Sequence, residues 1–278
     1  MLLYRTTSGW VMQNASGKFF SVPQSAQEGL TTREDLFEYL NAMTGFAMPL
    51  EAAPANLRAP IESQEVWAAG VTYYRSRSAR MAESHAAGGG DFYDRVYSAE
   101  RPELFMKAVA HRVVGPESPV RIRRDSKWNV PEPELTLLIS PKGKILGYTA
   151  GNDMSSRDIE GENPLYLPQA KVYDGSCALG PAILVTPEPL PSTTKISVKI
   201  QRGEKVMFNE STTLAEMKRT PVELSGYLYR ENSFPQGAML MTGTGVVPPD
   251  TFTLLPGDRV EVAIEGIGVL GNTVEQLA

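Results

Sequence analysis

Two glutamates spaced two residues apart, Glu132 and Glu134, are well suited to bind a metal ion. Pro131 and Pro133 alternate with them, and proline favours extended backbone at and before its own position. In an extended segment residues i and i+2 project on the same face, so the two carboxylates would point the same way and repel each other. A hard divalent cation, which takes carboxylate oxygens as ligands, is the simplest way to offset that repulsion. A solvated acidic strand edge is the alternative that the pair alone leaves open.

A third carboxylate, Asp153, is expected to join this pair through a β-hairpin. Two apolar runs, Leu135–Ile139 and Ile145–Thr149, are separated by Pro-Lys-Gly-Lys, which is typical of a hairpin turn. Such a hairpin would carry Asp153 back toward the glutamates. The sequence therefore predicts a site in which three carboxylates surround a divalent cation.

Strand-like runs dominate the part of the chain that must position these carboxylates. In addition to the two hairpin runs, we predict strands at Val66–Val71, Ala182–Val185, Ile196–Ile200, Lys205–Phe208, Ala238–Met241 and Arg259–Ile264. A helix is expected from Thr220 to about Tyr229, because Thr220, Pro221 and Glu223 form a helix-start pattern. The pattern indicates a β-dominated α+β fold with few helices.

The first 65 residues read as a small N-terminal α+β domain, followed by a larger domain over residues 66–278. The N-terminal part contains a strand near Trp10–Met12 and a helix that starts after Thr32, with an apolar stripe. The stripe consists of Leu36, Tyr39, Leu40 and Met43. In the larger domain, residues 75–84 and 91–98 also look helical, and the glycines at 88–90 between them are predicted to act as a lid.

Composition excludes several classes of protein. The net charge of −5 argues against a nucleic-acid-binding surface. No apolar run approaches the roughly 18 residues that span a bilayer, and we expect no membrane partner and no secretory signal. Cys177 is the only cysteine, which rules out an intrachain disulfide and fits a cytoplasmic protein. With only His85 and His111 available, a histidine-rich metal centre is excluded.

Six motifs together resemble those of the fumarylacetoacetate hydrolase superfamily, and they occur in that family's order over roughly residues 66–278. They are GVTYY (70–74), PEPEL (131–135), NDMSSRD (152–158), MTGTG (241–245), LPGD (255–258) and GIGVLGN (266–272). The resemblance implies the mixed β-roll of that superfamily, placed after the small N-terminal α+β domain. It also implies assembly as a homodimer or a higher homo-oligomer.

The resemblance also implies roles for the charged residues. Glu132, Glu134 and Asp153 match the positions that bind Mg²⁺, for which Mn²⁺ or Ca²⁺ are alternatives. Lys171 matches a lysine that reaches into the metal site and could shuttle protons.

Further residues are expected to contact the substrate, which the resemblance implies is a small 2-keto acid. Thr244 lies in the glycine-rich turn and could bind a substrate carboxylate. Lys107 follows an aromatic residue on a segment that enters the pocket in relatives. Ser156 and Arg157 of the NDMSSRD motif complete the expected substrate-binding set.

One departure from the family pattern points to a particular reaction. Hydrolases of the family carry a histidine shortly after the motif that reads GVTYY here, and this chain has none after Tyr74. Without that base, attack of water on a C–C bond lacks its usual activator. The segments at 101–108 and 162–171 instead resemble the branch that dehydrates 2-keto-3-deoxy sugar acids, in which Glu103 would assist proton transfer.

The resemblance therefore favours a Mg²⁺-dependent hydro-lyase, a carbon–oxygen lyase that would convert a 2-keto-3-deoxypentonate to 2,5-dioxopentanoate. An acylpyruvate-type hydrolase or an oxaloacetate decarboxylase on the same metal platform is the first alternative. A metal-binding structural protein of the same fold is the second. The presence of Lys171 argues against the second, because a structural site would not need that lysine.

Overall fold

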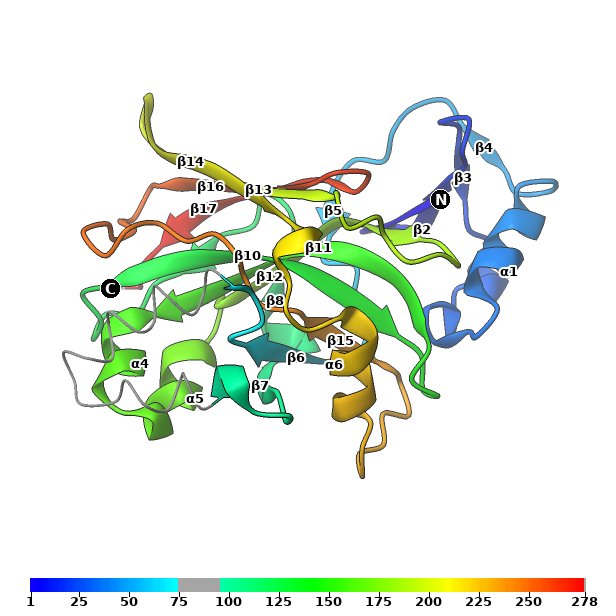
Figure 1. The fold of residues 1–278 in the computed structure, drawn as a ribbon. Coiled ribbons are helices and arrows are strands. Elements are labelled where there is room, and N and C mark those ends of the chain that lie inside the picture. Colours follow the sequence, from blue (N-terminus) through cyan, green and yellow to red (C-terminus); the bar gives the residue numbers. More distant parts are fainter. Residues whose placement is uncertain (75–95, 278) are drawn as a thin grey trace.

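Two packed β-sheets form most of the protein (Figure 1). The computed structural model describes residues 1–74 and 96–277; the helices predicted at 75–84 and 91–98 and the lid predicted at 88–90 lie wholly or largely outside the described residues. The strands of the larger sheet are β1 (Leu2–Thr6), β2 (Gly9–Gln13), β3 (Phe19–Ser21), β4 (Pro49–Leu50), β5 (Leu57–Arg58), β6 (Glu65–Gly70), β7 (Glu103–Val109), β8 (Val113–Val114), β10 (Asn129–Ile139), β11 (Ile145–Ser156), β12 (Cys177–Val185) and β15 (Ala238–Met241).

The smaller sheet packs over one face of the larger one (Figure 1). Its strands are β9 (Val120–Arg121), β13 (Lys195–Arg202), β14 (Lys205–Thr213), β16 (Arg259–Ile264) and β17 (Gly268–Glu275). The α-helices whose full length lies within the described residues are α1 (Leu36–Met43), α4 (Arg157–Glu162), α5 (Leu167–Lys171) and α6 (Pro221–Leu228). Short 3₁₀ helices lie at Gln24–Ala26, Leu30–Thr32, Ala110–Arg112, Pro164–Tyr166 and Leu214–Glu216. The predicted β-dominated α+β fold is confirmed.

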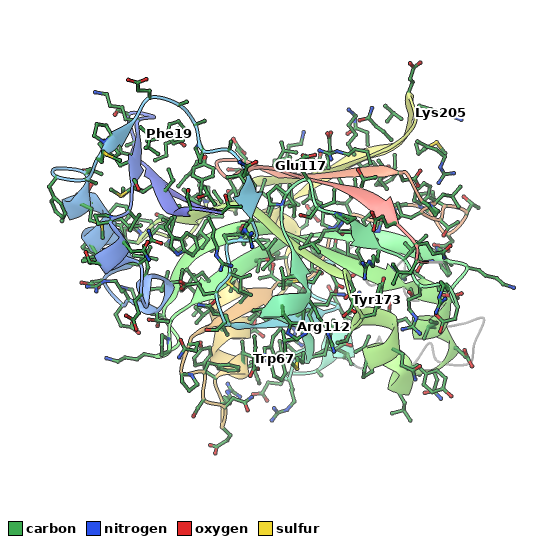
Figure 2. The ribbon with its side chains drawn as sticks, turned by 180° about the vertical axis from the view of Figure 1, so that it is seen from behind. Phe19, Trp67, Arg112, Glu117, Tyr173 and Lys205 are labelled. Carbon is green, nitrogen blue, oxygen red and sulfur yellow. The ribbon has the colours of Figure 1, made fainter. Side chains whose placement is uncertain are left out.

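The strand order explains how distant segments meet. The larger sheet runs β4-β3-β2-β1-β12-β11-β10-β15-β6-β7, with β5 beside β1 and β8 beside β12. The smaller sheet runs β14-β13-β16-β17-β9. The β13–β14 hairpin projects from the body of the protein, with Lys205 at its tip (Figure 2). No helix in residues 1–74 or 96–277 combines the length and apolarity needed to cross a bilayer.

The β10–β11 hairpin lies at the centre of the larger sheet and is longer than predicted. Its strands pair from Asn129 with Ser156 to Ile139 with Ile145. The predicted strand begins at Leu135, whereas the observed strand begins at Asn129 and includes two prolines, which cannot donate a hydrogen bond within a sheet. The structure accommodates Pro131 and Pro133 because the pairing of β10 with β15 begins only at Thr136.

Alternation along β10 separates the core from the carboxylates. Leu135, Leu137 and Ile139 join the hydrophobic cluster that β10 shares with β13, β16 and β17 of the smaller sheet. Because side chains alternate along a strand, Glu132 and Glu134 project toward the opposite face from Leu135.

The N-terminal segment extends the larger sheet, since Leu2 and Leu3 of β1 pair with Leu184 and Ile183 of β12. The predicted apolar stripe is confirmed on α1, which buries Leu36, Leu40 and Met43. The predicted start at Thr32 was wrong, because Thr32 closes a 3₁₀ turn and Asp35 precedes the helix instead. The domain boundary near residue 65 stays a prediction.

The predicted start of α6 is confirmed. Pro221 is its first residue, and the Thr220 side chain accepts a hydrogen bond from the Glu223 backbone N–H at 3.1 Å. This cap satisfies one of the backbone donors left over at a helix start.

Candidate metal centre and active site

Glu132, Glu134 and Asp153 meet on the β10–β11 hairpin. Glu132 lies directly opposite Asp153 in the antiparallel register, and Glu134 follows two residues later on the same strand face. One carboxylate oxygen from each residue lies within 4.8 Å of the others. All three side chains are buried, with residue exposures of 2%, 1% and 1%. The predicted return of Asp153 to the two glutamates is confirmed.

Three cationic side chains surround two of these carboxylates. Lys171 Nζ lies 2.7 Å from Glu132 Oε2 and 3.1 Å from Asp153 Oδ2. Lys107 Nζ lies 2.5 Å from Asp153 Oδ1, and Arg157 Nη1 lies 3.0 Å from Glu132 Oε1. These ion pairs are themselves buried, so they offset charge that would otherwise be costly to hold away from water.

Glu134 has a different partner, because its Oε2 accepts a hydrogen bond from the Gly243 backbone N–H at 2.5 Å. Burial, with repulsion from Asp153 and Glu132, raises the pKa of Glu134 well above its ordinary value, and Lys171 and the Gly243 N–H oppose that rise. A divalent cation between the carboxylates would relieve the repulsion. The buried oxygen donors therefore fit Mg²⁺ or a similar hard ion, held by Glu132, Glu134 and Asp153.

The raised pKa of Glu134 predicts how the stability of the metal-free protein depends on pH. The folded state favours the neutral form of the Glu134 carboxyl. The contribution of this group to the free energy of unfolding is therefore fully present below pH 4.5, its ordinary pKa, and is lost as the pH rises through the raised pKa of the folded state. In EDTA, the free energy of unfolding should fall over that range. Denaturant unfolding of the wild type and Glu134→Gln across pH values checks this, and parallel curves for the two proteins would contradict it.

Lys171 reaches the carboxylates from the last turn of α5, and it is 1% exposed. Its Nζ also donates a hydrogen bond to Ser155 Oγ. Ser155 shares a strand face with Asp153, whereas Ser156 points the other way and donates to Asn129 Oδ1 at 2.8 Å. The NDMSSRD motif pointed to Ser156 and not to Ser155, although the alternation of side chains along β11 distinguishes the two residues.

Lys107, on β7, is fully buried and joins three segments of chain. In addition to its contact with Asp153, its Nζ donates to the backbone carbonyls of Met154, at 3.0 Å, and Lys171. It therefore ties β7 to β11 and to the end of α5. Neither Lys107 nor Ser156 is among the described residues that line the cavity beside the β10–β11 hairpin.

A cavity of about 500 Å³ opens beside the carboxylates, which is within the size range of small-molecule sites. Its wall is built from the end of β6, strand β10, the start of α4, strand β14, and the glycine-rich turn with the loop that follows it. The lining residues are Ala69, Gly70, Val71, Glu132, Arg157, Met207, Phe208, Glu210, Gly243, Thr244, Gly245, Val246, Val247, Pro248, Pro249 and Asp250. The structure thus brings Arg157 and Thr244, two predicted substrate contacts, to the same cavity as the predicted metal ligand Glu132.

Glu103 lies against Gly70, which lines this cavity, and itself lines a neighbouring cavity. It is the first residue of β7 and pairs with Gly70 of β6. A Cβ atom added at Gly70 would lie only 2.1 Å from Glu103 Oε2, so the carboxylate occupies the space that a side chain would fill. Phe105, two residues along β7 from Glu103, has its ring centroid 6.0 Å from Lys171 Nζ.

Comparison with known proteins agrees with this geometry. The family model for the fumarylacetoacetate (FAA) hydrolase C-terminal domain matches residues 71–275. A probable 2-keto-3-deoxyxylonate dehydratase of Haloferax volcanii is 49% identical over 217 residues, which cover 77% of this chain and 73% of that protein. A 2-dehydro-3-deoxy-D-arabinonate dehydratase of Saccharolobus solfataricus is 43% identical over 220 residues, covering 78% and 74%.

A solved structure is also similar over the whole chain. It is a 2-keto-3-deoxy-D-arabinonate dehydratase complexed with magnesium and 2,5-dioxopentanoate. The TM-score is 0.82 at 32% identity, covering 100% of this chain and 99% of the other. The resemblance that the six motifs indicated is therefore confirmed, and this chain belongs to the fumarylacetoacetate hydrolase family.

Proposed function

We propose that this protein is a Mg²⁺-dependent dehydratase that converts a 2-keto-3-deoxypentonate to 2,5-dioxopentanoate and water. The observation that carries the proposal is the buried set of Glu132, Glu134 and Asp153, in contact with Lys171, at the edge of a small cavity. Two relatives that are 49% and 43% identical are named as dehydratases of such acids. Magnesium and the proposed product are the ligands named for the similar structure.

The bound ion would stabilise charge on the substrate, and Lys171 and Glu103 would transfer the protons. A bound Mg²⁺ would hold the substrate's C1 carboxylate and C2 keto oxygen and stabilise the charge that develops on that oxygen. We propose that Glu132, Glu134 and Asp153 hold the ion, and that Lys171 and Glu103 move the protons. A proton leaves C3 and the hydroxyl leaves C4 as water. Loss of one C5 proton and of the C5 hydroxyl proton, with protonation at C3 and C4, then gives the C5 aldehyde.

The two proposed proton-transfer groups come from different elements, and each lies against a residue that lines the cavity. Lys171 of α5 contacts Glu132, and the Glu103 carboxylate of β7 lies against Gly70. We propose Thr244 and Arg157 as the contacts for the rest of the substrate, because both line the cavity. Lys107 and Ser156 were predicted to contact the substrate. Their side chains instead bind buried groups of the protein, so we propose that they support the structure of the site.

A substrate panel tests the proposed reaction against its alternatives. We expect aldehyde formation from a 2-keto-3-deoxypentonate in Mg²⁺, and little loss of acylpyruvate absorbance or of oxaloacetate. Faster turnover of an acylpyruvate would favour the hydrolase, and faster loss of oxaloacetate the decarboxylase. Binding of Mg²⁺ with no turnover of any of the three would favour a structural protein.

Replacing Gly70 by alanine should lower kcat by about tenfold or more, because the new methyl group would displace the Glu103 carboxylate. Gly70 lies in a strand without the left-handed backbone that demands glycine, so the protein should fold. Gly226→Ala is a matched control, since nothing lies within 4 Å of its added Cβ. Steady-state kinetics that are equal for both variants would contradict a role for Glu103 in proton transfer.

We also propose that the protein acts as a homodimer in the cytoplasm. The homodimer is suggested by the family resemblance, and the cytoplasm by the single, buried thiol of Cys177. Light scattering coupled to size-exclusion chromatography should give a mass of twice 30.4 kDa. Fractionation of the cells that make the protein should recover it in the cytoplasmic fraction.

A further inference from the structure

The Gly243 N–H that binds Glu134 belongs to a turn that is fixed tightly to β10. The Thr242 backbone N–H and hydroxyl both donate to the Leu135 carbonyl, at 3.0 and 2.9 Å. Gly243 has a φ of +86°, a conformation in which glycine avoids the strain of a side chain. The turn therefore contacts β10 at Glu134 and at the residue that follows it.

Thr72 holds the same turn from the other side. Its Oγ1 donates to the Thr242 carbonyl at 2.6 Å, and the residue is 0% exposed. A Cβ atom at Gly243 would lie 2.1 Å from Thr72 Oγ1, so the hydroxyl is packed against the peptide that it binds. The Thr72 carbonyl is itself anchored by the Lys218 backbone N–H at 2.8 Å.

The chain reaches this position through unusual backbone. Val71, just before Thr72, has a φ of +53° and is 3% exposed. A β-branched residue rarely adopts a positive φ, and such outliers gather at sites where the surrounding structure requires them. Here the turn at Val71 follows Gly70, which packs against Glu103, and precedes Thr72, which binds the glycine-rich turn.

We propose that Thr72 is a positioning residue for the metal ligand Glu134. By fixing the Thr242 carbonyl, its hydroxyl orients the next peptide so that the Gly243 N–H points to one oxygen of Glu134. That bond sets the rotation of the carboxylate and leaves its other oxygen directed toward Asp153 and Glu132. In other proteins, removing the hydrogen-bond partner of a metal ligand typically weakens the affinity for the metal by about 10- to 100-fold.

This inference rests on the proposed metal site, and metal binding tests it without turnover. Thr72→Val removes the hydroxyl and keeps the shape, and Thr72→Ser keeps the hydroxyl. In a titration with Mn²⁺ followed by electron paramagnetic resonance, Thr72→Val should raise the Kd by about tenfold or more, and Thr72→Ser by about twofold or less. Thr149→Val is the matched control: Thr149 is 0% exposed and its hydroxyl donates to the Gly180 carbonyl, at 3.3 Å.

The outcomes separate this inference from the proposed function. An unchanged Kd in Thr72→Val, with or without a lower unfolding temperature in EDTA, would overturn the positioning role alone. An equal rise in Kd in Thr149→Val would also overturn it, because any lost buried hydroxyl would then have the same effect. Absence of Mn²⁺ and Mg²⁺ binding by the wild type would overturn both. Metal binding that depends on Thr72, in a protein without dehydratase activity, would support this inference and overturn only the proposed function.

Discussion

Replacing Lys171 by methionine should lower kcat by about 10²-fold or more, because the substitution removes the proposed proton-transfer group beside the three carboxylates. Methionine is similar in length, and the site is buried, so the variant should keep its shape. Removing one partner of a buried ion pair is destabilising, since Glu132 and Asp153 lose the ammonium that offsets their charge. Kinetics should therefore be measured with saturating Mg²⁺, after circular dichroism has shown that the variant is folded.

The matched control for this prediction is Lys142→Met, at an exposed position in the turn of the β10–β11 hairpin, which should leave kcat unchanged. A Lys171→Met protein that binds Mg²⁺ and turns over at the wild-type rate would show that Lys171 transfers no proton. If so, Glu103 or water would have to perform both proton transfers.

Replacing Glu134 by glutamine should remove Mg²⁺-dependent activity, with a loss of at least about 10²-fold. The amide keeps an oxygen that can accept the Gly243 N–H, but it lacks the charge that attracts the cation. Because burial and its neighbours raise the pKa of Glu134, the neutral side chain should not destabilise the metal-free protein near neutral pH. Mg²⁺ should raise the unfolding temperature of the wild type and not of the variant.

Thermal unfolding with EDTA and with Mg²⁺ measures this difference directly. Glu204→Gln, at an exposed position of the β13–β14 turn, should retain the full Mg²⁺-induced shift. An equal shift in Glu134→Gln would mean that Glu134 is not a metal ligand.

The meeting of Glu132, Glu134 and Asp153 was predictable because its geometry is local. One hairpin turn and the alternation of side chains suffice to bring Asp153 opposite Glu132. The same alternation placed Glu134 on the correct face. The prolines limited the prediction of the strand itself, because their tolerance depends on where β15 begins to pair with β10.

The supports of the site were not predictable in the same way, because they depend on contacts between distant segments. Thr72 and the Thr242 carbonyl are separated by 170 positions in the sequence. They meet because β6 and β15 pair in parallel, which places the C-terminal ends of these two strands side by side. Met207 and Phe208 reach the cavity from the other sheet, and no motif marks them.

The central claim, Mg²⁺-dependent dehydration at C4, is tested most directly by nuclear magnetic resonance of the reaction in D₂O. With a ¹³C-labelled 2-keto-3-deoxypentonate and Mg²⁺, we expect 2,5-dioxopentanoate that carries solvent deuterium at C4, and no conversion in EDTA. The deuterium is expected because C4 loses its hydroxyl and is then protonated from solvent. Pyruvate with glycolaldehyde, or unchanged substrate in the presence of Mg²⁺, would contradict the claim.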